Sequence, residues 1–340
     1  MKILVLGAGG TGGYFGGRLA EAGADVTFLV RERRAQQLAQ RGLQIESPAG
    51  NITLPVRTVL AANLKPEFDI IILACKAYDL ESSIAAIKPA MGVDTKPAMG
   101  ADTKPAMGAS MDASIDTRTG TVIVPLLNGI AHLDALDAAF GSARVMGGTC
   151  QIAATLTPDG VVKSMADTHS ITWGAREGLH KPQQQKIAEA LGVAFANTTV
   201  AWKVSDHIML DMWEKIAFLS TLAAMTCLMR ANVGEILATP DGKNIMTRYV
   251  QTSMAIAAAE GYPPRAHVVE RFEKILASQH STLTASMLRD LENGHEVEAD
   301  HIVGYMLNKA REHHIDDYLI AMAFTHLKAY QQRRLGKRLA

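Results

Sequence analysis

The first thirty residues carry the clearest hydrophobic pattern of the chain. An apolar run at residues 3–6 leads into a glycine-rich turn at residues 7–12, an amphipathic segment and a second apolar run at residues 26–30. Short apolar runs next to turn residues are typical of buried strands, and the amphipathic spacing between them predicts a helix. The order of strand, glycine turn, helix and strand predicts the opening βαβ unit of a doubly wound parallel sheet.

Further strands and helices continue this α/β pattern to about residue 203. Residues 68–74 (FDIIILA) are apolar almost without interruption, which is typical of a strand buried on both faces. A third strand at residues 43–45 and a return through residues 52–59 predict a hairpin that turns at residues 48–50. The other predicted elements of this half are helices at 33–41, from Asp79 and at 181–191, and strands at 121–127, 143–146, 150–156, 161–164, 170–173 and 199–202.

From residue 205 onward the spacing of apolar residues changes to three and four, which predicts helices. They are expected at residues 208–230, 243–260, 267–279, 300–313 and 317–332. The predicted fold is therefore α/β plus all-α, with a Rossmann-type dinucleotide-binding domain at residues 1–203 and an all-helical domain at residues 204–340. The chain of 340 residues is long enough for both.

A tandem repeat interrupts the first domain. The sequence KPAMG recurs from Lys88, Lys96 and Lys104 with a period of eight. Three short copies are too few for a solenoid, and the Pro and Gly of each copy oppose both helix and strand. Residues 90–117 are therefore predicted to form a mobile surface insert without chemistry of its own.

The composition favours a globular protein without a nucleic-acid or membrane partner. Hydrophobic residues make up 48% of the chain, and Lys+Arg and Asp+Glu both number 34, so the formal net charge is zero. Charged residues interrupt every long apolar run. Cys75, Cys150 and Cys227 lie far apart, and a strand begins at the N-terminus without room for a targeting peptide, which predicts a reduced, cytoplasmic protein. No metal site is expected at His313 and His314, because the aspartates beside them are natural helix caps.

The glycine turn GAGGTG has the spacing of a dinucleotide-binding motif. Gly7 permits the tight turn out of the strand, Gly9 lets backbone N–H groups approach a pyrophosphate, and Gly12 lets the helix pack closely on the sheet. The pyrophosphate is expected at the helix N-terminus, beside Gly10 and Thr11. A βα turn without a ligand is the alternative, but the flanking strands favour binding.

Arg31 ends the second strand, where a site for NAD usually has Asp or Glu to bind the ribose 2′-hydroxyl. A guanidinium suits a 2′-phosphate instead. Arg33 and Arg34 follow closely, although at least one of them is expected simply to begin a solvated helix. The predicted cofactor is NADP(H).

Two polar residues follow buried strands at the edge where doubly wound sheets bind ligands. Lys76 follows residues 68–74 and could meet cofactor phosphate or ribose; Asn128 follows residues 121–127 and could hydrogen-bond nicotinamide or substrate. An Asn before Gly is also an ordinary turn residue, so its role stays open. In the helical half Lys215 lies among apolar residues, which is common for a lysine whose stem covers a helix face.

Together these motifs resemble those of the ketopantoate reductase family, in the family's order and over nearly the whole chain outside the repeat. The run SMLRDLENGHEVEADHIVG, with Glu298 twelve residues after Ser286, is the most specific of them. The other matching pieces are MKILVLGAGGTGGYFGGRLAEAG, Arg31, ACKAYD, LNG, MWEKI and ANVGEI. The resemblance implies NADPH-dependent reduction of a 2-oxo acid to a 2-hydroxy acid, in a cleft between the two domains.

The resemblance also implies roles for individual residues. Lys215 matches the family's catalytic lysine and Glu298 its acidic partner. The polar residues that match the substrate cleft are Asn128, Ser286 and Asn232. An ammonium at Lys215 would stabilise the negative charge that develops on a carbonyl oxygen and donate a proton to it. A carboxylate beside this lysine would keep it charged.

One departure from the family leaves the substrate open. The family's lysine helix has asparagines four and eight residues after the lysine, and here those positions are Leu219 and Ala223. A site without these polar partners loses discrimination for a polar substrate. One candidate function is reduction of 2-dehydropantoate to pantoate in pantothenate biosynthesis; reduction of a less polar 2-oxo acid and inactive NADP binding are the others. Helical second domains of this kind occur in monomers and in dimers, so a homodimer stays open.

Overall fold

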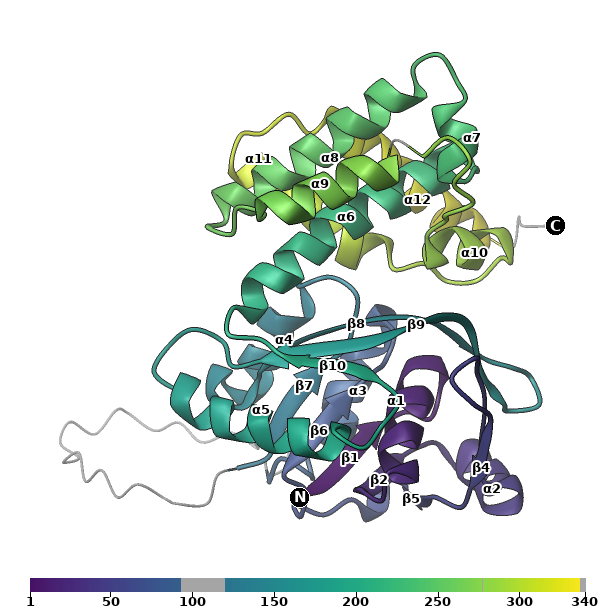
Figure 1. The fold of residues 1–340 in the computed structure, drawn as a ribbon, viewed down its shortest axis with the longest axis vertical. Coiled ribbons are helices and arrows are strands. Elements are labelled where there is room, and N and C mark those ends of the chain that lie inside the picture. The colour runs from purple at the N-terminus through teal and green to yellow at the C-terminus, as the bar shows by residue number, and fades with distance from the viewer. Residues whose placement is uncertain (93–119, 277, 337–340) are drawn as a thin grey trace.

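The computed structural model describes residues 1–92, 120–276 and 278–336. They form the expected α/β and helical domains, and Figure 1 shows the helical domain stacked on the two sheets, with α6 (Ile208–Met229) running from one domain into the other. Most of the insert predicted at residues 90–117 lies outside the described residues. Its first residues are not an exposed loop, because Ala90 and Met91 are buried in the core.

The first sheet of the described residues has five parallel strands in the order β5-β2-β1-β6-β7, with β1 at the centre. Their bounds are β1 (Lys2–Leu6), β2 (Asp25–Leu29), β5 (Arg57–Val59), β6 (Ile70–Leu73) and β7 (Val122–Pro125). The segment predicted as the third strand does not join this sheet. It is β3 (Leu43–Glu46), which pairs with β4 (Ile52–Leu54) and turns away into a second sheet, so that β5 takes the place beside β2.

Side chains of the first sheet alternate between two cores. On β1, Ile3 and Val5 face a core that includes α1 and the second sheet, whereas Leu4 faces a core that continues into the helical domain. β6 alternates in the same way, which explains its nearly continuous apolar sequence. One face of the sheet and the helical domain therefore share a core, and the two domains pack firmly against each other.

The second sheet packs against the other side of α1 (Gly10–Glu21). Its strands lie in the order β10-β9-β3-β4, and β8 pairs with β9. The other strands and α-helices of this domain are β8 (Gly147–Leu156), β9 (Val162–Gly174), β10 (Ala201–Val204), α2 (Glu32–Arg41), α3 (Leu80–Ile87), α4 (His132–Phe140) and α5 (Lys181–Phe195). The two strands predicted at 161–164 and 170–173 are the single strand β9, and the strand predicted at 143–146 is a 3-10 turn followed by an isolated bridge at Val145.

The helical domain is built around α6. Its other helices are α7 (Val233–Leu237), α8 (Gly242–Ala259), α9 (Ala266–Leu276), α10 (Ser286–Glu292), α11 (Tyr305–Glu312) and α12 (Tyr318–Leu335). The helix predicted at residues 300–313 begins with a π-helical turn at Asp300–Gly304 and continues as α11. α7 and α10 were not among the predicted helices, because five and seven residues are too few to show helical spacing.

Among the helices of the described residues, α6 has the length and mean hydropathy of a membrane span, although Glu214 and Lys215 interrupt its apolar run as expected. In the structure 72% of its most apolar stretch of 18 residues is buried. α8, α10 and α12 pack around it, which is why apolar residues occur on all its sides. This helix forms the core of the helical domain.

Candidate active site

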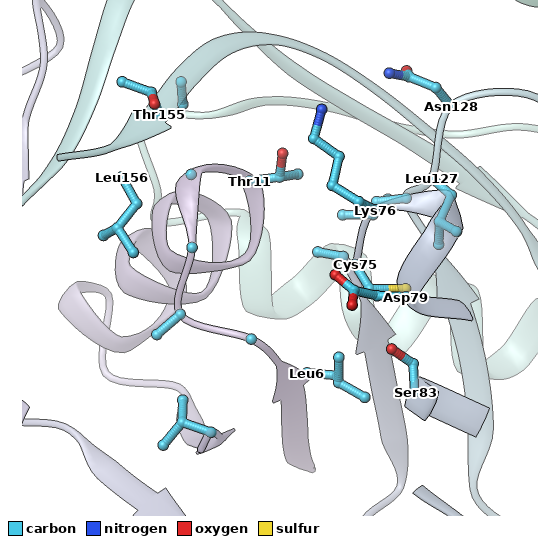
Figure 2. Close-up of a pocket in the computed structure, with 18 of the residues that line it drawn as sticks. Leu6, Thr11, Cys75, Lys76, Asp79, Ser83, Leu127, Asn128, Thr155 and Leu156 are labelled. Atoms are coloured by element: carbon cyan, nitrogen blue, oxygen red, sulfur yellow. The ribbon is translucent and has the colours of Figure 1, made fainter. Parts of the chain in front are cut away.

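A cavity of about 730 Å³ opens at the carboxyl ends of the parallel strands. Its walls come from the glycine turn after β1, the ends of β2, β6 and β7, one edge of β8, and α10 of the helical domain. Figure 2 shows Lys76 and Asn128 on one side of this space, with Thr11 between them and the glycine turn. Both its position and its size suit a dinucleotide with a small substrate.

The glycine turn fits a bound pyrophosphate. Gly7 has a φ of +88°, and a Cβ at Gly12 would overlap the carbonyl oxygen of Gly7. A Cβ at Gly10 would lie 2.6 Å from the carbonyl oxygen of Ala154. Gly9 differs, because its φ is −87° and a Cβ there would have no described atom within 4 Å. No side chain of the described residues caps α1, so its first N–H groups are open to an anion in the cavity.

Arginines reach the cavity from the end of β2. The side chain of Arg31 is 87% exposed and lies 3.6 Å from the carboxylate of Asp79, so it is accessible to a ligand. Arg34 is half-buried and donates hydrogen bonds to the carbonyl oxygens of Ala8 and Gly160, which fastens the glycine turn to the loop between β8 and β9. Arg33 is exposed and does not line the cavity. Of these three, Arg31 is the residue that could bind a 2′-phosphate.

An ion cluster fixes the rotation of α6 about its axis. Arg265, just before α9, donates hydrogen bonds to the carboxylates of Asp211 and Glu214. Trp213 is buried and packs against a tyrosine ring 6.1 Å away. These contacts hold one side of α6 against the start of α9 and leave Lys215 facing β8 and the cavity.

The amino group of Lys215 lies just behind the cavity wall. Nζ donates hydrogen bonds to the carbonyl oxygen of Cys150, at 2.7 Å, and to Oδ1 of Asn128, at 3.3 Å, and both partners line the cavity. Burial lowers the pKa of Lys215, while the negative charge of Glu298 opposes this shift. A lysine whose pKa is closer to neutrality is a more effective proton donor at physiological pH.

Lys76 joins the two domains. Its Nζ lies 3.1 Å from Oδ2 of Asp290 on α10 and 3.6 Å from Oε2 of Glu298. Glu298 also accepts a hydrogen bond from the backbone N–H of Ala77, at 2.9 Å. Burial lowers the pKa of Lys76, but the two carboxylates outweigh that effect and the net shift is upward. Among the described residues Glu298 makes no ion pair with Lys215, because its oxygens are taken by Lys76 and the Ala77 amide.

The remaining residues that the sequence relates to the substrate do not all lie at the cavity. Ser286 begins α10 and lines the cavity. Asn232 does not line it; its side chain accepts a hydrogen bond from the N–H of Glu235 and caps α7. Leu219 is half-buried, Ala223 is fully buried, and neither lines the cavity.

Several cavity residues were not predicted as site residues. Arg289 lies one helical turn after Ser286, and that spacing alone would have placed both on one face of a helix. Residues 152–156 of β8 reach the cavity through the pairing of β8 with β9, which no local pattern reveals.

Burial raises the pKa of Cys75, which also lines the cavity, to about 11, so its sulfur is a thiol at neutral pH. All three cysteines are free, and the part of the chain that the structure describes has no cluster of His, Cys, Asp and Glu able to hold a metal.

His132, at the start of α4, is buried close to this site. Within the described residues neither ring nitrogen has a hydrogen-bond partner. Burial, helped by the positive charges of His301 and Lys215, lowers its pKa from 6.5 to about 3. Between these two values the unfolded chain binds a proton here that the folded protein excludes, so the free energy of unfolding falls as the pH falls.

Between pH 7 and pH 5 the free energy of unfolding should therefore fall by about 2 kcal/mol less in His132→Leu than in the wild type. Urea unfolding at the two pH values measures this difference. The matched control is His280→Leu, since His280 is exposed and its variant should follow the wild type. An equal loss in His132→Leu and the wild type would contradict a neutral, buried His132.

Comparison with known proteins identifies the family. The model of "Ketopantoate reductase PanE/ApbA" matches residues 3–99 and 100–178, and that of its C-terminal domain matches residues 207–331. YkpB of Bacillus subtilis, named an uncharacterized oxidoreductase, is 32% identical over 98% of this chain and 100% of its own length. The 2-dehydropantoate 2-reductase of Halobacterium salinarum is 25% identical over 93% of this chain and 94% of its own.

Solved structures share the fold. A PanE/ApbA family ketopantoate reductase from Ralstonia eutropha and a D-mandelate dehydrogenase with NADH and anilino(oxo)acetate each have a TM-score of 0.79 with this structure. Each is 20% identical and covers 98% of this chain and 100% of its own. The family models span both domains, the helical domain carries Lys215 and Ser286, and the glycine turn has the geometry of a dinucleotide site. The protein therefore belongs to the ketopantoate reductase family of oxidoreductases.

Proposed function

We propose that this protein uses NADPH to reduce the carbonyl group of a 2-oxo acid to a 2-hydroxy acid. The observation that carries the proposal is the position of Lys215, whose amino group is bound to Asn128 at the wall of a cavity that also contains a dinucleotide-binding glycine turn. A proton donor is therefore one hydrogen bond from the space that a nicotinamide and a carbonyl compound would share. Relatives named 2-dehydropantoate 2-reductase support this reaction class.

Different residues of the cavity would have different roles in this reaction. The glycine turn would hold the pyrophosphate and Arg31 the 2′-phosphate; when bound, the reduced nicotinamide supplies a hydride to the carbonyl carbon. Lys215 stabilises the negative charge that develops on the carbonyl oxygen and donates a proton to it from Nζ. Asn128 orients that amino group, and the charge of Glu298 favours the protonated form of the lysine. The hydroxyl of Ser286 is available to hydrogen-bond the substrate.

Arg31 is expected to select the cofactor. A guanidinium bound to a 2′-phosphate should make the dissociation constant of NADPH about tenfold to a hundredfold lower than that of NADH. Arg31→Ala should remove most of this difference and leave NADH binding nearly unchanged, as titration of protein fluorescence would show. Arg33→Ala is the control, since Arg33 is an exposed neighbour that does not line the cavity. Equal affinities of the wild type for the two cofactors would overturn the role of Arg31.

Within this class, 2-dehydropantoate is the first substrate we propose, with pantoate for pantothenate biosynthesis as the product. A less polar 2-oxo acid is the second, because Leu219 and Ala223, which stand where the family has asparagines, are apolar and outside the cavity lining, so these positions offer a polar substrate no amide group. Steady-state NADPH oxidation with 2-dehydropantoate, 2-oxoisovalerate and phenylglyoxylate separates the two by kcat/KM. Turnover of none of a broad panel of 2-oxo acids would contradict the proposal and favour an inactive NADP-binding protein.

A further inference from the structure

We propose that Arg289 of α10 binds the carboxylate of the substrate and so restricts this site to 2-oxo acids. The inference deepens the function proposed above and rests on it.

Of the described residues, four cationic side chains line the cavity, those of Arg31, Arg34, Lys76 and Arg289. The first three have partners: a carboxylate beside α3, two backbone carbonyl oxygens, and two carboxylates of the helical domain, respectively. The guanidinium of Arg289 has no hydrogen-bond or ion-pair partner within the described part of the chain. A guanidinium without a partner at the wall of a concave site suits a planar anion, which it can bind through two parallel hydrogen bonds.

The position of Arg289 favours a substrate carboxylate over a cofactor phosphate. The predicted phosphate sites lie in the α/β domain, at the glycine turn and Arg31, whereas Arg289 belongs to the helical domain. Ser286 precedes it by one turn of α10 and lines the same cavity. The hydroxyl and the guanidinium together would donate the hydrogen bonds that the two oxygens of a carboxylate accept.

The packing of α10 keeps this pair of side chains at the cavity. Met287 and Leu288 are buried in the core of the helical domain, and Asp290 is held by Lys76 from the opposite domain. The face of the short helix that carries Arg289 therefore stays toward the cavity.

A substrate carboxylate also needs a positive partner in this site. Glu298 lines the cavity, and its negative charge would repel the carboxylate. In the proposed mechanism the ammonium of Lys215 is used at the carbonyl oxygen. α6 offers no amide groups for the substrate, because Leu219 and Ala223 are apolar and lie outside the cavity lining. Arg289 is then the free cation of the described lining that can balance the carboxylate.

Calorimetric titration of oxamate, an unreactive 2-oxo acid analogue, into the full-length protein saturated with NADP+ tests this assignment. Arg289→Gln should raise the dissociation constant of oxamate about tenfold to a hundredfold, because the arginine is exposed and water weakens its charge interactions. Arg289→Lys should lose less, because it keeps the charge without the planar fork. Arg271→Gln is the matched control, since Arg271 is an exposed arginine of α9 outside the cavity lining.

The affinity for NADP+ should be unchanged in all of these variants. Oxamate binding to Arg289→Gln as tight as to the wild type, or no oxamate binding to the wild type, would overturn the assignment. Weaker NADP+ binding with unchanged oxamate binding would also overturn it and assign Arg289 to the cofactor. If oxamate binding depends on Arg289 but no 2-oxo acid is reduced, the proposed reaction fails and the carboxylate site stands.

Discussion

Lys215→Ala is expected to lower kcat with the best 2-oxo acid by about a hundredfold or more, the usual effect of losing a positioned proton donor. The affinity for NADPH should change little, because the glycine turn and Arg31 belong to the other domain. The kcat of the wild type should also fall with rising pH at a value below 10.5, since burial lowers the pKa of the lysine. Steady-state NADPH oxidation over a pH series and a cofactor titration measure these quantities.

Lys274→Ala is the matched control for this prediction, because Lys274 is an exposed lysine of α9 outside the cavity. Glu298→Gln should also lower kcat, and in combination with Lys215→Ala its effect should be less than additive, since the carboxylate acts on the lysine. A Lys215→Ala protein that is less stable but turns over at nearly the wild-type rate would show that the lysine only covers the surface of α6.

Gly9→Ala should weaken NADPH binding on the order of a hundredfold while leaving the melting temperature nearly unchanged. The methyl group would enter open space in the free protein, where no described atom lies within 4 Å and the φ of −87° suits alanine. That same space is where the pyrophosphate must approach the first N–H groups of α1, and each lost hydrogen bond to a charged group costs about 1.5–3 kcal/mol. Thermal unfolding and cofactor titration separate the two effects.

Gly12→Ala provides the contrast. Its methyl group would overlap the carbonyl oxygen of Gly7, a backbone atom that cannot move without disturbing the turn. This variant should therefore lose melting temperature as well as NADPH affinity. A Gly9→Ala protein that binds NADPH like the wild type would remove the glycine turn from the cofactor site.

The sequence allowed the fold class to be predicted because the fold class depends on local periodicity. The buried strands β1, β6 and β7 are apolar almost throughout, and the long helices from α6 onward keep a helical spacing. The assignment of strands to sheets could not be predicted. β3 has the pattern of any short strand, and only its pairing with β4 and β9 places it in the second sheet and leaves β5 beside β2.

Part of the candidate site could likewise be predicted from the sequence, and part of it could not. The glycine turn, Arg31 and Asn128 were predicted as site residues because they follow strands, and the structure places them at the cavity. The partners of Glu298 were not predictable, since its contacts with Lys76 and the Ala77 amide join residues more than two hundred positions apart. The sequence related Asn232 to the substrate cleft. In the structure its side chain instead caps α7, a helix of five residues that is too short to be recognised from its spacing.

The transfer of deuterium from cofactor to product tests whether this protein reduces a 2-oxo acid with a hydride from NADPH. NADPH labelled with deuterium at the transferable position of the nicotinamide is incubated with the best 2-oxo acid of the panel, and the product is analysed by mass spectrometry and NMR. We expect a 2-hydroxy acid with one deuterium at C2, formed by the wild type and by Lys274→Ala but about a hundredfold more slowly by Lys215→Ala. Absence of label at C2, or labelling that is independent of Lys215, would contradict hydride transfer with Lys215 as the proton donor.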